Sequence, residues 1–191
     1  MTRPRIRTLV VLLVAAAAAV LGVFALQGLR TAEAGSTTVS QTRTVLPAAE
    51  RPAAPVLDGT TLTGEHLSTA DWRGSVIVVN FWGSWCTPCR KEAPGLRRVA
   101  DETSRQGVRF VGVDVRDTPV AGLGFEHDFG ITYPSFNDPA TKLSLRFGSL
   151  APQATPSTYV FDRKGRIAAV FFGATTYDEL YSAVELVVEK G

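Results

Sequence analysis

The chain has 191 residues, of which 45% are hydrophobic and 20% are charged, so it is long enough for one globular domain with an appendage but short for two full domains. The formal net charge of +2 comes from the N-terminus: four of the 20 basic but only one of the 18 acidic residues lie within residues 1–34, which leaves 16 basic and 17 acidic side chains in the rest of the chain. Without a basic field there is nothing to hold a nucleic-acid backbone, so the composition argues against nucleic-acid binding.

An apolar segment close to the N-terminus predicts export. Residues 9–26 are eighteen apolar residues without a charge, and three arginines precede them. About 20 apolar residues are enough for a membrane-spanning helix, while the A-E-A triplet ending at Ala34 is a pattern for signal cleavage. We predict that residues 1–34 are an anchor or a signal segment, and we prefer the anchor because the run is longer than a usual signal core. Since the arginines stay on the cytoplasmic side, both alternatives place residues 35–191 outside the cytoplasmic membrane.

The segment after this apolar run has a composition of its own. Residues 35–54 are rich in Ser, Thr, Ala and Pro and contain few large apolar side chains. This composition is typical of a flexible linker with a stiffer, proline-bearing end. We therefore predict a linker at 35–54 and one folded domain at 55–191.

The predicted elements of the domain alternate between strands and helices. In chain order they are a short hairpin about Asp58-Gly59, a helical turn at 68–72, a strand at 75–81, a helix at 89–106, a strand at 108–113, helices at 120–129 and 140–147, two strands at 157–161 and 166–172 joined as a hairpin, and a helix at 177–189. The strand at 75–81 is β-branched and apolar almost throughout, which indicates burial on both faces. This order predicts an α/β fold with a central mixed sheet flanked by helices on both faces.

The only two cysteines, Cys86 and Cys89, stand in the sequence W-C-T-P-C between a predicted strand and a predicted helix. A zinc site needs about four ligands, and His66 and His127 have no finger-like spacing to the cysteines, so a metal site is disfavoured. A structural disulfide across so small a loop would stabilise little. The context favours a redox centre.

The position of Cys86 at the start of a helix explains how such a centre would work. There the unpaired amides and the helix dipole stabilise a thiolate, and Arg90 and Lys91 add positive charge. Cys89, one turn further, faces the same way and can resolve a mixed disulfide. Pro88 is tolerated in the first turn and stiffens it.

Two segments carry a resemblance to a known family: V-V-N-F-W-G-S-W-C-T-P-C-R-K-E-A-P, and T-P-S-T-Y-V-F-D-R-K-G-R-I later in the chain. They resemble the TlpA/ResA-type thioredoxin-like proteins, which are membrane-tethered thiol–disulfide oxidoreductases of the extracytoplasmic space. The resemblance covers about residues 55–190. It implies a thioredoxin fold, a redox-active disulfide, Cys86 as the attacking thiol and Cys89 as the resolving thiol.

The resemblance also assigns supporting roles. Thr155-Pro156 matches the cis-proline that lies against the thiol pair, where the backbone of Thr155 would pair with a substrate. Glu92 matches an acidic residue that exchanges a proton with the second cysteine. Asn80 replaces the buried acid of cytoplasmic thioredoxins, which favours the acid–base role of Glu92. Trp85 is expected to form a wall of the substrate groove.

One departure from the family concerns the link before the cis-proline. Residues 148–155 (G-S-L-A-P-Q-A-T) are longer than usual there. We expect the extra residues to alter the groove beside Cys86 and with it the choice of partner.

The implied function is the reduction of disulfides in exported proteins such as apocytochrome c, with a membrane thiol-reductant donor as second partner. No cofactor beyond the two thiols and no metal is expected. A thiol peroxidase is an alternative, although residues 79–86 lack the proline and hydroxyl of the peroxidatic motif. A copper carrier that uses Cys86 and Cys89 as soft ligands is a further alternative.

Overall fold

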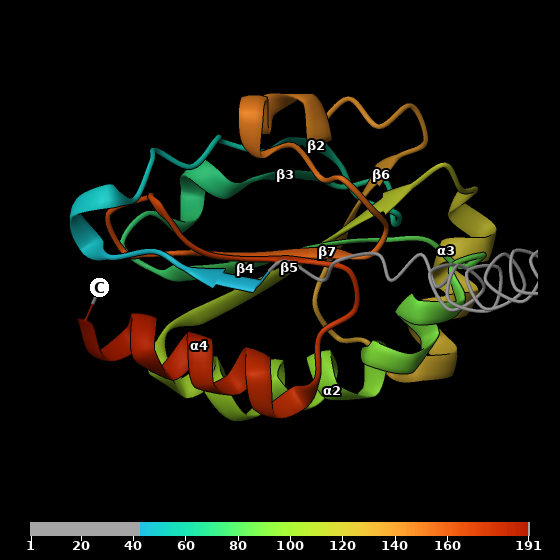
Figure 1. The fold of residues 1–191 in the computed structure, drawn as a ribbon. Helices are drawn as coiled ribbons and strands as arrows, with labels where there is room; N and C mark the ends of the chain where they lie inside the picture. Colours follow the sequence, from blue (N-terminus) through green and yellow to red (C-terminus); the bar gives the residue numbers. More distant parts are fainter. Residues whose placement is uncertain (1–42, 191) are drawn as a thin grey trace, which may run out of the picture. The chain divides into compact units, whose positions relative to one another are not determined.

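A mixed six-stranded sheet forms the centre of the computed structural model, which describes residues 43–190 (Figure 1). Its strand order is β1 (Arg43–Val45), β8 (Ile167–Phe172), β7 (Ser157–Phe161), β4 (Val76–Trp82), β5 (Val108–Val115) and β6 (Ser135–Asp138). The pairs β4–β5 and β5–β6 are parallel, and the other three pairs are antiparallel. The predicted α/β class with a mixed sheet is confirmed.

Different elements cover the two faces of the sheet. Helices α2 (Thr87–Thr103) and α4 (Tyr177–Lys190) lie side by side on one face, and the hairpin of β2 (Asp58–Thr60) and β3 (His66–Ser68) and the 3-10 helix η4 (Ser144–Leu150) lie over the other (Figure 1). Helix α3 (Pro119–Phe129) contacts α2. The remaining short 3-10 helices are η1 (Ala48–Glu50), η2 (Thr69–Trp72) and η3 (Ser104–Gln106).

Strand β4 is buried along its whole length, as its sequence predicts. Val76 and Val78 belong to the cluster beneath α2 and α4, whereas Ile77, Val79 and Phe81 belong to the cluster on the opposite face. Alternate side chains of a strand point to opposite faces, so a central strand covered on both sides has to be apolar at every position. This strand thereby holds the start of α2 at a fixed place.

Two predictions of local structure are wrong. Asp58-Gly59 lies inside β2 rather than in a turn; the chain reverses over residues 61–65, where Thr61 Oγ1 accepts a hydrogen bond from the amide of Glu65. Residues 140–147 do not form a regular helix, because β6 ends at Asp138, whose carboxylate accepts hydrogen bonds from the amides of Lys142 and Leu143. The next element is the short 3-10 helix η4.

The predicted linker needs a correction as well. Its second half belongs to the fold, since β1 pairs with β8 and Arg51 is only 8% exposed. The guanidinium of Arg51 binds the buried carboxylate of Asp162 at 3.1 Å. The folded region therefore includes residues 43–54 and does not begin near Pro55.

The predicted anchor or signal, residues 1–34, lies outside the described residues. Within residues 43–190, no helix combines the length and the apolar character that crossing a membrane requires.

Candidate active site

The two cysteines lie where β4 leads into α2 through residues 83–86. Cys86 is the N-cap residue of α2, and its sulfur lies 3.2 Å from the backbone nitrogen of Cys89. The two sulfurs are joined in a disulfide, and both residues are at most 2% exposed. The predicted position of Cys86 at the helix N-terminus is confirmed, so the amides and the dipole of α2 act on its sulfur.

The tryptophans on either side of Gly83 and Ser84 have different environments. Trp82 is buried and stacks on Phe125 of α3 with the ring centroids 4.4 Å apart. Trp85 is 48% exposed, and its indole N–H donates to the carbonyl of Val115 at 3.2 Å. A Cβ atom at Gly83 would lie 2.5 Å from Trp85 Nε1, so glycine is needed for the indole to fold back over the loop. Trp85 therefore stands as an exposed wall beside the disulfide.

The segment before β7 lies against the cysteines. The Thr155-Pro156 peptide bond is cis, as the resemblance implies. The carbonyl oxygen of Thr155 lies 3.6 Å from Cys86 Sγ. Pro156 is buried, whereas Thr155 remains partly accessible. This arrangement puts a backbone carbonyl within reach of whatever is bound to Cys86.

Glu92 lies one turn after Cys89 and is only 4% exposed. Its carboxylate accepts two hydrogen bonds of 2.9 Å, from Asn80 Nδ2 and from the amide of Thr175. No cation forms an ion pair with it among residues 43–190. Burial raises the pKa of Glu92 to about 7, although the hydrogen bonds from Thr175 and Asn80 oppose this rise. A carboxyl group with this pKa can both give and take a proton near neutral pH.

Asn80 connects Glu92 with the sheet. Its side-chain amide also donates to Thr158 Oγ1 on β7 at 3.0 Å, and it is 3% exposed. Asn80 and Cys89 line the same small cavity of about 10 Å³. Glu92 also lines an open groove of about 380 Å³ together with Lys91 and Thr175. Glu92 thus reaches the groove, and its donor Asn80 lines the cavity at Cys89.

The structure brings the predicted site residues together at one end of β4. Cys86, Cys89, Glu92 and Pro88 come from α2 or its cap, and Asn80 comes from β4. Trp85, Thr155 and Pro156 come from the adjoining loops. Pro88 is exposed at the second position of α2, and its role in stiffening the first turn stays a prediction.

The sequence analysis missed three residues at the end of β5. Asp117 accepts a hydrogen bond from the amide of Ser84 at 2.7 Å, and the guanidinium of Arg116 lies 4.6 Å from the ring of Trp85. Asp114 is 1% exposed, and burial, together with the charges of Asp117 and Glu126, raises its pKa to about 8. A signal was available, because the carboxyl ends of adjacent parallel strands meet at one edge of a sheet, where ligands commonly bind.

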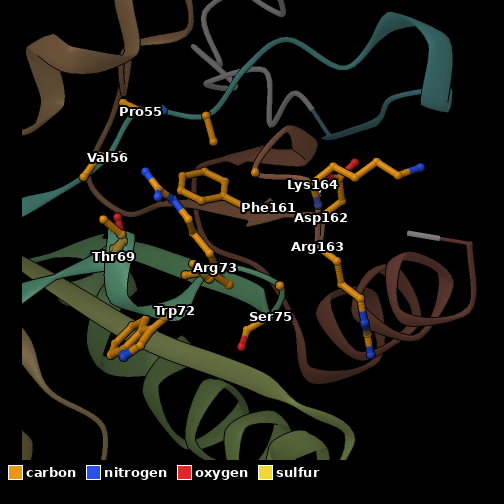
Figure 2. Close-up of a pocket in the computed structure, with 15 residues that line it drawn as sticks. Pro55, Val56, Thr69, Trp72, Arg73, Ser75, Phe161, Asp162, Arg163 and Lys164 are labelled. Carbon is orange, nitrogen blue, oxygen red and sulfur yellow. Dashed lines mark hydrogen bonds between the residues drawn. The ribbon is translucent and has the colours of Figure 1, made fainter.

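A pocket of about 300 Å³ lies at the opposite end of β4 (Figure 2). It is lined by residues 54–56, 69, 70, 72–75, 77 and 161–165, and it contains none of the predicted site residues.

A disulfide at the start of a helix, a cis-proline against it and a mixed sheet of this order define a thioredoxin-fold thiol–disulfide oxidoreductase. Comparison with known proteins agrees with that class. The chain belongs to the AhpC/TSA family, whose sequence profile matches residues 51–170.

Individual relatives show which members of this class the chain resembles in sequence. The chain is 28% identical to the thiol-disulfide oxidoreductase ResA of Bacillus anthracis over 127 residues, which cover 66% of this chain and 72% of the relative. It is also 28% identical to ResA of Bacillus subtilis over 124 residues, which cover 65% and 68%. The resemblance to TlpA/ResA-type proteins is thereby confirmed.

Solved structures give the same result for the fold. A DsbF homologue from Corynebacterium diphtheriae matches with a TM-score of 0.72 and 32% identity, over 78% of this chain and 96% of that one. A secreted thiol-disulfide isomerase from Corynebacterium glutamicum matches with a TM-score of 0.74 and 28% identity, over 80% and 95%. The predicted enzyme class, a thiol–disulfide oxidoreductase that acts outside the cytoplasm, is confirmed.

Proposed function

We propose that this protein reduces disulfides of exported proteins, apocytochrome c among them, and that a membrane thiol-reductant donor returns it to the dithiol form. The observation that carries the proposal is the Cys86–Cys89 disulfide at the N-terminus of α2, beside the carbonyl of Thr155. That disulfide is the product that reduction of a substrate would leave behind. The TlpA/ResA resemblance supports the choice of substrate and donor.

The exchange takes place in two displacements. The thiolate of Cys86 attacks one sulfur of the substrate disulfide; a mixed disulfide forms, and the other substrate sulfur leaves as a thiolate and takes up a proton. The thiolate of Cys89 then attacks Cys86 Sγ, which releases the second substrate thiolate and forms the Cys86–Cys89 disulfide. Two electrons pass from the cysteine pair to the substrate. The helix N-terminus favours the first step because it stabilises the attacking thiolate.

Glu92 is proposed to accept the proton of Cys89 before the second displacement. Its pKa of about 7 leaves enough carboxylate to act as base at neutral pH. Asn80 holds the carboxylate in place through its 2.9 Å hydrogen bond. The open groove that Glu92 lines lets the proton continue to solvent.

Thr155, Pro156 and Trp85 are proposed to bind the substrate. The free edge of the Thr155 backbone accommodates an extended chain on one side of the disulfide, and Trp85 borders the other side. For attachment, we propose that residues 9–26 anchor the chain to the cytoplasmic membrane or that cleavage near Ala34 releases it.

The test uses disulfide-bonded C-x-x-C-H peptides and insulin as substrates of the purified, pre-reduced chain. We expect the wild-type protein to reduce both, and Cys86→Ser to lower the rate at least a thousandfold because the attacking sulfur is lost. Cys89→Ser serves as the matched control, since it keeps the attacking thiol and should accumulate the mixed disulfide, visible by mass. Equal rates for wild type and Cys86→Ser would refute the proposal.

The direction of electron flow is tested separately. Equilibration with glutathione gives the reduction potential, and a value below about −200 mV supports a reductant. A value near that of strong oxidants would reverse the direction proposed here. Rapid consumption of hydrogen peroxide by the same preparation would favour the peroxidase alternative. Tight Cu(I) binding would favour the carrier, although within residues 43–190 no three His, Cys, Asp or Glu side chains are grouped to hold a metal.

A further inference from the structure

A second groove lies beside Thr155, the residue whose carbonyl oxygen faces the disulfide. It has a volume of about 300 Å³, and its lining includes Arg116, Thr141, Ser144 and residues 152–155. Thr155 belongs both to this groove and to the surroundings of the disulfide, because its carbonyl oxygen lies 3.6 Å from Cys86 Sγ. A peptide attached to Cys86 that runs past Thr155 therefore has this groove next to it.

The guanidinium of Arg116 is held at the rim of the groove by uncharged partners. It lies 4.6 Å from the ring of Trp85 and 3.4 Å, through one nitrogen, from Thr155 Oγ1. Trp85 is itself fixed by its hydrogen bond to the carbonyl of Val115. The charge thus occupies a defined position between the loop that precedes Cys86 and the loop that precedes Pro156.

This charge is not neutralised within the described domain. The ion pairs formed within residues 43–190 do not include Arg116. The neighbouring carboxylate of Asp117 is engaged elsewhere, since its two oxygens accept hydrogen bonds from the amides of Ser84 and Thr118. An exposed arginine held without an acidic partner offers its hydrogen-bond donors to a ligand carboxylate.

The backbone at the groove is strained in two places. Arg116 has a φ of 53° and Thr141 a φ of 55°, and they are the only non-glycine residues of the region 43–190 with positive φ. For a β-branched residue such as Thr141 this conformation is a clear outlier. Strain of this kind concentrates at ligand sites. Both outliers line the same groove.

We propose that Arg116 is a specificity-determining residue that binds an acidic side chain next to the attacked cysteine of the substrate. The ligand class is therefore a disulfide-containing peptide with Asp or Glu close to the cysteine. This inference rests on the proposed function, because it concerns the substrate of the same disulfide exchange.

The test compares three peptides that share one internal disulfide and differ only in Glu, Gln or Lys beside the first cysteine. Each rate constant with the pre-reduced full chain is divided by that with dithiothreitol, which corrects for the effect of the peptide charge on its own sulfur. The wild-type protein should prefer Glu over Gln about two- to fivefold, as expected for one partly exposed ion pair. Lys should be the slowest, and 1 M salt should weaken the preference.

Variants of the protein test whether Arg116 causes the preference for the Glu peptide. In Arg116→Gln the Glu-to-Gln ratio should fall to about 1, whatever happens to the absolute rates, and Arg116→Lys should keep part of it. Lys164→Gln makes the same charge change at the pocket of Figure 2 and should leave the ratio at its wild-type value.

Two outcomes would overturn the inference: a wild-type ratio of 1, or a ratio that survives in Arg116→Gln. A lack of reduction of the Gln peptide by wild type would instead count against the proposed function itself. Circular dichroism of each variant shows whether a changed ratio belongs to folded protein.

Discussion

Two carboxylates are buried at opposite ends of the central sheet, and they differ in what surrounds them. Asp162, at the end of β7, is 1% exposed and lies between the guanidinium groups of Arg51 and Arg166, at 3.1 Å and 2.8 Å. Glu92, beside the cysteines, is 4% exposed, and its partners within residues 43–190 are the neutral donors of Asn80 and Thr175.

The protonation of the two groups follows from these partners. Burial on its own raises the pKa of Asp162, but the hydrogen bonds and charges of Arg166 and Arg51 outweigh it, and the pKa lies below the usual value. Burial raises the pKa of Glu92 to about 7, and no cation within residues 43–190 forms an ion pair that would offset it. A buried carboxylate paired with cations stays ionised and links the segments that supply those cations. A buried carboxylate without a cation can exchange its proton at neutral pH.

The largest expected effect is the loss of stability when the buried ion pairs of Asp162 are removed. Asp162→Asn retains an oxygen for the amides of Lys164 and Arg166 but leaves the buried guanidinium of Arg51 without its counter-charge. We expect the free energy of unfolding to fall by about 3–5 kcal/mol. Urea denaturation followed by tryptophan fluorescence measures the loss.

Asp101→Asn is the matched control, because it removes a carboxylate from an exposed ion pair with Arg97. Its cost should stay below about 1 kcal/mol. Similar losses in the two variants would mean that burial does not distinguish the two pairs.

A smaller effect is expected in the pH dependence of stability. The folded protein keeps a proton on Glu92 between pH 4.5, its ordinary pKa, and about 7, where the unfolded chain has released it. Stability therefore falls as the pH rises through this window, by up to about 3 kcal/mol from this group. Asp162 acts in the opposite sense: its contribution is present above pH 3.8 and is lost as the pH falls below that value.

The free energy of unfolding of wild type and of Glu92→Gln, measured between pH 4.5 and 8, isolates the contribution of Glu92 to stability. The stability of the variant relative to wild type should increase with pH and level off above about 7. Glu65→Gln, a substitution at an exposed position, is the control and should run parallel to wild type. Parallel curves for Glu92→Gln would show that burial of this carboxyl costs nothing.

The smallest effect, expressed as a free energy, is the expected change in the rate of disulfide exchange. Glu92→Gln removes the proton acceptor for Cys89, so the rate of peptide reduction should fall by about tenfold to a hundredfold. The wild-type rate should show an inflection near pH 7 that the variant lacks. Stopped-flow measurement across pH 5.5–8.5 tests both, and a slower rate with the inflection intact would assign Glu92 a structural role only.

The elements that could be predicted are those in which a run of consecutive apolar residues indicates burial. β4 is apolar at every position because both faces of the sheet are covered there, and its pattern is sufficient to predict it. β6 and β1 were missed because they are short, and each is held by a neighbouring strand that lies far away in the sequence.

The candidate site divides in the same way. Cys86 and Cys89 lie one turn apart at the start of one helix, so their spacing indicates that they act together, and the family resemblance adds Glu92 one turn further. Arg116 and Asp117 carry no motif, and they reach the loop that precedes Cys86 only because β5 lies parallel to β4. Their contacts with Trp85 and Ser84 depend on that pairing.

The sequence by itself determined the dithiol, its position at the start of a helix and the strand that supports it, since these depend on neighbouring residues and local periodicity. Tertiary structure alone decided which carboxylates meet a cation and which do not, because Arg51 and Asp162 come together only when β1 and its adjoining segment close onto β8. The charge state of a buried group depends on partners distant in the chain, and this is why the contrast between Asp162 and Glu92 emerged only from the folded protein.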